Sequence, residues 1–153
     1  MKLTHAIIAG GLLAGLGDIA YACIHSYVAN GTAPERILQS VAAGLVGPDA
    51  ARSGGWGTAA LGLVAHFSMT LIMALVFNLA ATVLPLLRRM WALTGPLYGV
   101  ALMFVMNLIV VPLSAAGRPA ALPPGQFLYG AIFAHTILVG LVIAWFASRV
   151  RKA

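Results

Sequence analysis

The chain has 153 residues, of which 61% are hydrophobic and only 8% are charged. Soluble domains carry about 25% charged residues, so this composition excludes an ordinary water-soluble domain. The net charge of +6 comes from basic residues at the ends of apolar segments. This placement indicates contact with anionic lipid and a role in membrane orientation, and it does not favour binding of nucleic acid. The single cysteine, Cys23, excludes an internal disulfide.

Four apolar segments are long enough to cross the hydrocarbon core of a bilayer, which is about 30 Å thick. Only helices and closed barrels satisfy the backbone there, and the alternating segments typical of a barrel are absent. The sequence therefore predicts one all-α membrane domain over residues 1–153, a four-transmembrane-helix bundle. The predicted spans are residues 5–28, 56–84, 91–113 and 127–147, the first of them retained and not cleaved as a signal peptide.

The segment between the first two spans predicts a short amphipathic helix over residues 33–46, in the first outer loop. Thr32 and Glu35 have the spacing of a capping box, and Pro34 suits the first helical turn. The helix is too short to cross the membrane, so we expect it at the membrane surface. Residues 53–55, Ser-Gly-Gly, are expected to form a flexible joint into the second span.

The distribution of basic residues predicts a bacterial inner-membrane protein with both termini in the cytoplasm. Loops on the cytoplasmic side of a membrane carry an excess of Lys and Arg. With the N-terminus inside, the inner side holds Lys2, Arg88, Arg89, Arg149, Arg151 and Lys152, and the outer side holds Arg36, Arg52 and Arg118.

Each predicted span contains a polar side chain, and such residues are costly inside a membrane and suggest a functional site. The helical rise places Asp18 and His66 roughly 15 Å below the outer face, His135 roughly 12 Å and Asn107 roughly 9–10 Å. If all four face the bundle interior, they form one polar layer. His25 follows Asp18 by seven residues on nearly the same helix face, so it would form the entrance from the outer surface.

The two deep histidines leave three interpretations open. His66 and His135 can be packed residues that hydrogen-bond across helices, groups that handle protons or ions, or ligands of haem or a transition metal. Asp18 is either neutral and hydrogen-bonded or charged and paired with a protonated histidine. Because neither histidine belongs to an HxxxH or ExxH pattern, the cofactor is unknown and metal or haem binding is not favoured.

Gly11 and Gly15 lie four residues apart and give the first span a smooth face for helix packing, within the chain or in a homo-oligomer. The motifs of common enzyme classes are absent, including the nucleophile elbow, the phosphate-binding loop, paired carboxylates and HExxH. We therefore expect no enzymatic activity.

Several stretches of the second half carry a resemblance to a known group. They are "AHFSMTLIMALVF" with His66, "LPLLRRMW", "VVPLS" with Pro112, and "FAHTILVGLVIAW" with His135 before a basic tail. Over roughly residues 60–152 the chain resembles the YagU-like group of bacterial inner-membrane proteins. That group is associated with acid resistance, so the resemblance implies a pH-linked role for His66 and His135.

Together, these observations predict a membrane protein whose buried polar layer responds to or conducts protons or small ions. Asp18 and His135 would be relay partners of His66, with His25 at the entrance and Asn107 orienting them. A pore inside one copy would be narrow, so conduction would need an oligomer. The alternatives are a haem- or metal-binding protein that uses His66 and His135, and a structural or assembly protein with no buried active site.

Overall fold

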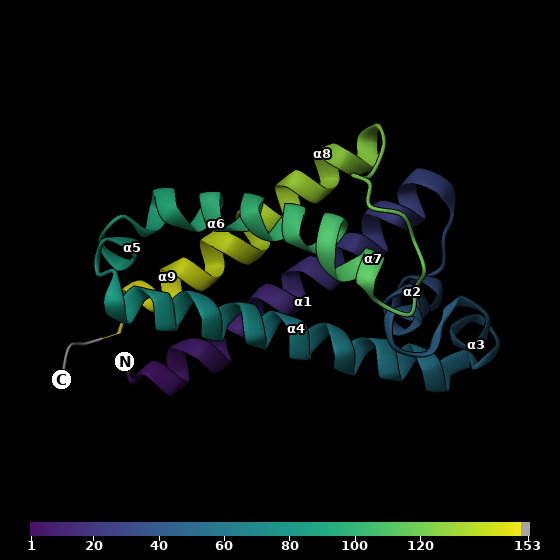
Figure 1. The fold of residues 1–153 in the computed structure, drawn as a ribbon, viewed down its shortest axis with the longest axis horizontal. Helices are drawn as coiled ribbons and strands as arrows, with labels where there is room; N and C mark the ends of the chain where they lie inside the picture. The colour runs from purple at the N-terminus through teal and green to yellow at the C-terminus, as the bar shows by residue number, and fades with distance from the viewer. Residues whose placement is uncertain (151–153) are drawn as a thin grey trace.

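The computed structural model describes residues 1–150, and they form an all-α bundle around four long helical stretches (Figure 1). These stretches are long and apolar enough to cross a membrane, and they comprise Leu3–Asn30 (α1), Gly55–Val83 (α4), Trp91–Leu113 and Gln126–Ser148. The predicted fold class is confirmed. The chain is a multi-pass membrane protein.

The third and fourth stretches each contain a π-helical segment, in which backbone hydrogen bonds skip one more residue than in an α-helix. The third consists of α6 (Trp91–Val105), η1 (Met106–Val110) and α7 (Val111–Leu113). The fourth consists of α8 (Gln126–Phe133), η2 (Ala134–Leu141) and α9 (Val142–Ser148). Such segments occur frequently at functional sites, and they carry Asn107 and His135 here.

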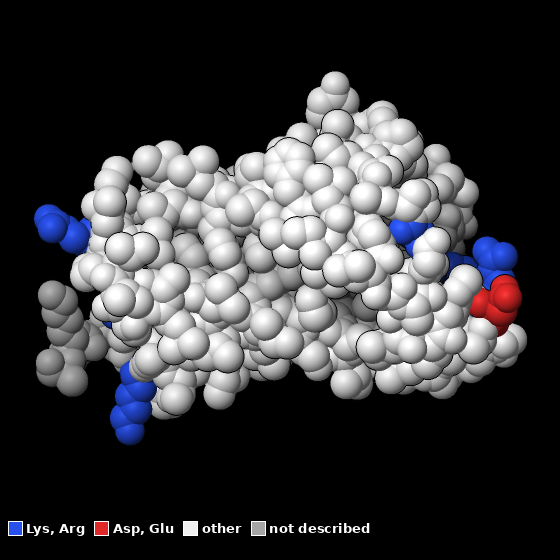
Figure 2. All heavy atoms as spheres, viewed as in Figure 1, with Lys and Arg blue, Asp and Glu red and all other residues white. Residues whose placement is uncertain are grey.

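Apart from Asp18 within α1, the charged residues that the structure describes gather at the two ends of the bundle. The N-terminus, the end of α9 and α5 (Leu86–Arg89) lie at one end, and α2 (Pro34–Val46) and α3 (Pro48–Ser53) lie at the other (Figure 1). Figure 2 shows Lys and Arg near both ends of this face and a broad uncharged belt between them. Because charge is costly in hydrocarbon, this belt is the part of the surface that suits the membrane.

Glycines allow close contact between the long helices. Gly11 and Gly15 lie against α4, and a Cβ atom on Gly15 would be 2.6 Å from the hydroxyl oxygen of Thr70. The glycine face of α1 is therefore covered by α4 of the same chain. Gly99 of α6 lies against the carbonyl oxygen of His135, where there is no room for a side chain.

The amphipathic helix α2 packs on the beginning of α4 through a buried glutamine. Gln39 is only 3% exposed, and its amide nitrogen donates to the Gly55 carbonyl at 3.0 Å and to the Glu35 carboxylate at 3.2 Å. The guanidinium of Arg36 donates to the amide oxygen of Gln39 at 2.8 Å. One buried side chain thus fixes α2 against the second span.

One local prediction in this region is wrong, and the structure describes a second segment more closely. Ala33, not Thr32, is the N-cap of α2, because the Thr32 hydroxyl donates to Asn30 at 2.6 Å instead of capping the helix. The segment expected to be a flexible joint is the junction of two helices, since α3 ends at Ser53 and α4 begins at Gly55. The Thr58 hydroxyl ties the two helices together through the carbonyl of Ala51, at 2.6 Å.

The main apolar core lies in the half of the bundle nearer the chain termini. It is built from α1, α4, α6, η2 and α9. Its buried members are Ala14, Met73, Ala74, Phe77, Leu102, Val139, Ile143, Ala144 and Ala147. The other half of the bundle is less tightly filled and contains the cavity described next.

Candidate functional site

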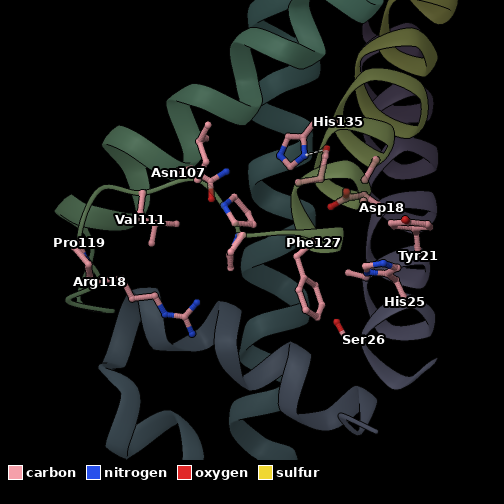
Figure 3. Close-up of a pocket in the computed structure, with 18 residues that line it drawn as sticks. Asp18, Tyr21, His25, Ser26, Asn107, Val111, Arg118, Pro119, Phe127 and His135 are labelled. Atoms are coloured by element: carbon pink, nitrogen blue, oxygen red, sulfur yellow. Dashed lines mark hydrogen bonds between the residues drawn. The ribbon is translucent and has the colours of Figure 1, made fainter. Parts of the chain in front are cut away.

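A cavity of about 630 Å³ lies between α1, η1 and η2, at the end of the bundle that carries α2 (Figure 3). It forms because α6 and η2 pack closely while α7 and α8 diverge beyond them (Figure 1). The loop that joins α7 to α8 passes beside it. We call it the interhelical cavity. Its walls are mainly apolar, and the polar side chains among them are Asp18, Tyr21, His25, Ser26, Asn107, Arg118 and His135.

Four of the residues singled out in the sequence line the interhelical cavity. Asp18 and His25 come from α1, Asn107 comes from η1, and His135 comes from η2. The seven-residue spacing of Asp18 and His25 puts both on one face of α1, with His25 nearer the α2 end. The fifth residue, His66, does not line the cavity.

His66 meets the cavity through Asp18. The side chain of His66 is 11% exposed, and its Nε2–H donates to the carbonyl oxygen of Gly15 at 2.9 Å. The same nitrogen lies 3.9 Å from the Asp18 carboxylate. The carboxylate therefore touches His66 while it also lines the cavity, and a proton added to the second ring nitrogen would place an imidazolium beside it.

His135 and Asn107 are bonded to their own helices. The Nδ1–H of His135 donates to the Ala131 carbonyl at 2.9 Å, which leaves Nε2 as an acceptor. Figure 3 shows this ring pointing across the cavity toward the helix of Asn107. The amide nitrogen of Asn107 donates to the Met103 carbonyl at 2.8 Å. Within residues 1–150, Asn107 makes no hydrogen bond to a histidine, so it does not orient one directly, and only His66 makes the cross-helix bond expected of a packed histidine.

Aromatic rings hold His25 in place within the cavity wall. The His25 ring stacks on Tyr21 with ring centroids 5.3 Å apart, and it meets the edge of Phe127 at the same centroid distance. Gly130 allows this arrangement, because a Cβ there would be 3.1 Å from both the His25 ring and the Tyr21 hydroxyl. The loop residue Arg118 lines the same cavity as His25.

Sequence reasoning did not select Tyr21, Phe127 or Arg118 for the site. The signal for Tyr21 was present, since it lies on the same α1 face as Asp18 and His25. Arg118 lies in an irregular loop, where no periodicity relates it to the spans.

The arrangement does not favour a haem or metal held between His66 and His135. The two rings do not share a cavity, and Nε2 of His66 is already bonded to a backbone carbonyl. Across residues 1–150 there is no group of three or more His, Cys, Asp or Glu side chains placed to hold a metal ion.

No protein-family model, curated protein or solved structure matches the chain. The resemblance to the YagU-like group stays a prediction that depends on the stretches quoted above.

Proposed function

We propose that the chain is a non-enzymatic membrane protein that responds to protons through Asp18 and His66. One observation carries the proposal: the Asp18 carboxylate lies 3.9 Å from His66 and also lines a cavity with two further histidines. Imidazole is the side chain whose ordinary titration lies nearest to physiological pH.

The charges of Asp18 and His66 are coupled by their surroundings. A charged carboxylate in this partly buried position is costly without a partner, and a protonated His66 provides one. The attraction between the two side chains therefore requires a proton on His66 and none on Asp18. The other titratable or charged groups that line the same cavity are Tyr21 and His25 from α1, His135 from η2 and Arg118 from the loop.

The packing beyond His66 supports a response to protons more than conduction through one copy. Thr70, one turn along α4, is buried, and its hydroxyl donates to its own helix at Phe67. The apolar core follows, and Asn78 lies twelve residues from His66, or roughly 18 Å along the helix. A proton that reached His66 from the cavity would meet packed methyl and aromatic groups.

We further propose a bacterial inner-membrane location with both termini in the cytoplasm. The end of the bundle that holds the chain termini carries Lys2, Arg88, Arg89 and Arg149. Loops on the cytoplasmic side of a membrane carry an excess of such basic residues. Arg151 and Lys152, which contribute to the predicted excess, lie outside the described residues. The resemblance of residues 60–152 to a group associated with acid resistance agrees with a pH-linked role.

The response is tested with a fluorescent label beside the cavity. Ala121 in the loop is replaced by cysteine in a Cys23→Ser background, labelled with an environment-sensitive dye and titrated in liposomes. We expect a reversible transition between about pH 5 and 8. It should be absent in Asp18→Asn and His66→Gln and retained in His5→Gln, whose histidine is exposed at the start of α1. The same transition in all three variants would exclude the Asp18–His66 pair as its origin.

Conduction is tested separately as proton flux into liposomes with an imposed pH gradient. We expect no flux above that of empty liposomes from folded protein. Flux that rises in acid and disappears in the His66→Gln/His135→Gln double variant would replace the proposed response with transport.

A further inference from the structure

A second hollow, of about 730 Å³, lies beside the interhelical cavity, between the α1–α2 turn, α2 and α3. We call it the arginine pocket, because Arg36, Arg52 and Arg118 line it together with one acid, Asp49. Three guanidinium groups against one carboxylate favour an anion. Arg118 lines both the arginine pocket and the interhelical cavity, so the two hollows meet at its side chain.

The arginine pocket is partly preorganised. Buried Gln39 accepts from Arg36 at 2.8 Å, and Arg36 also donates to the backbone carbonyl of Arg52 at 3.2 Å. Glu35 does not line the pocket, and its carboxylate accepts from the Gln39 amide. Within residues 1–150, no hydrogen bond or ion pair engages the guanidinium of Arg52 or Arg118, so both keep their donors for a ligand.

The interhelical cavity continues from Arg118 as a mainly apolar surface. Leu122, Phe127 and Val111 line it together with small residues of α1 and η2. Figure 3 shows the Arg118 side chain extending from the loop toward the space between α1 and η1. A ligand bound here would therefore have an acidic group next to an apolar part.

We propose that the arginine pocket and the interhelical cavity together bind a membrane lipid with an acidic phosphate head group. One guanidinium group can donate two parallel hydrogen bonds to the oxygens of a phosphate. A cavity of this volume is of the size that accommodates small ligands. The head group occupies the arginine pocket, and part of an acyl chain enters the cavity past Arg118. The site goes beyond the proton response and does not depend on it.

The test measures lipid binding to the full chain in detergent by native mass spectrometry. Phosphatidylglycerol and phosphatidylcholine with identical acyl chains are compared, and we expect tighter binding of phosphatidylglycerol. Arg118→Gln should weaken that binding by about tenfold, which corresponds to about 1.4 kcal/mol. Arg89→Gln, at the opposite end of the bundle, should leave it unchanged. Equal binding of the two lipids, or an equal loss in both variants, would overturn the proposal.

A second pair of variants tests the cavity without changing charge. Ala22 lines the cavity, whereas Ala20 is exposed on α1, so Ala22→Phe should weaken phosphatidylglycerol binding and Ala20→Phe should not. Free glycerol phosphate should not compete with the lipid. If it competes fully at equal concentration, the ligand is a soluble anion and the lipid proposal is wrong. His66→Gln, which should abolish the proton response and lines neither hollow, should still bind phosphatidylglycerol, so the two proposals can fail independently.

Discussion

The Nε2–H of His66 donates to the carbonyl oxygen of Gly15 at 2.9 Å, which joins a ring on α4 to the backbone of α1. The helices can approach this closely because residue 15 has no side chain. A Cβ there would lie 2.6 Å from the Thr70 hydroxyl oxygen and 2.9 Å from the Phe67 ring. The same glycine therefore sets the helix separation and the distance between His66 and Asp18.

Replacing Gly15 with alanine should destabilise the bundle and disturb the polar site together. The added methyl forces α1 away from α4, and overpacking of this kind costs about 1–3 kcal/mol. The free energy of unfolding in detergent measures the loss. Gly17→Ala is the matched control, because its Cβ would lie 3.6 Å from the nearest atom, an ordinary contact with Leu138. Equal losses in the two variants would show that the contact at Gly15 is not limiting.

Replacing Gln39 with alanine should release α2 from α4. The change removes the acceptor of Arg36 and the donor to the Gly55 carbonyl, and it leaves that backbone group in need of a partner. We expect a loss of about 1–3 kcal/mol and faster hydrogen exchange confined to residues 34–53. Ser40→Ala is the control, because the Ser40 side chain is exposed and bonds only to its own helix at Ile37. Unchanged exchange in Gln39→Ala would mean that apolar packing alone holds α2.

The antiparallel arrangement of the four spans can be checked with single cysteines. In a Cys23→Ser background, cysteines replace Ser53 at the end of α3 or Ser148 at the end of α9, which lie at opposite ends of the bundle (Figure 1). We expect a membrane-impermeant thiol reagent to label position 53 in intact cells and position 148 only after the membrane is opened. Labelling of both from the same side would contradict the four-span topology, and the reverse order would place the termini outside.

The membrane fold could be predicted from hydropathy because its physical cause is local. A backbone in hydrocarbon has to satisfy its own hydrogen bonds, so each long apolar run becomes a helix regardless of its neighbours. The cap at Ala33 and the short helix α3 were not predicted. The hydroxyls of Thr32 and Thr58 each had several partners within reach, and only the structure shows that Thr32 bonds to Asn30 and Thr58 to Ala51. The pattern of apolar residues also did not indicate the two π-helical segments.

The candidate site was only partly readable from the sequence, because depth and rotation have different determinants. The helical rise gives the depth of a residue, and the spacing of Asp18 and His25 puts them on one face of one helix. The rotation of α4 depends on its contact with Gly15, so the sequence could not say that His66 would meet Asp18 and not the cavity. Arg118 is positioned by an irregular loop and was therefore placed only at the outer surface.

A double-mutant cycle between Asp18 and His66 tests their pairing directly. The side chains of Asp18 and His66 are 20% and 11% exposed and lie 3.9 Å apart. Each single substitution should therefore lower the free energy of unfolding, and the second substitution should cost less once the first has removed the pair. We expect a coupling energy of about 1 kcal/mol from Asp18→Asn, His66→Gln and the double variant, measured by unfolding in detergent. The coupling requires a proton on His66 and none on Asp18. Because an imidazole is charged only when it is protonated, the coupling should be larger in acid than in alkali. The cycle of Asp18→Asn with His5→Gln should be additive at every pH. A coupling that does not change with pH would mean that His66 acts only as a neutral hydrogen-bond donor to Gly15.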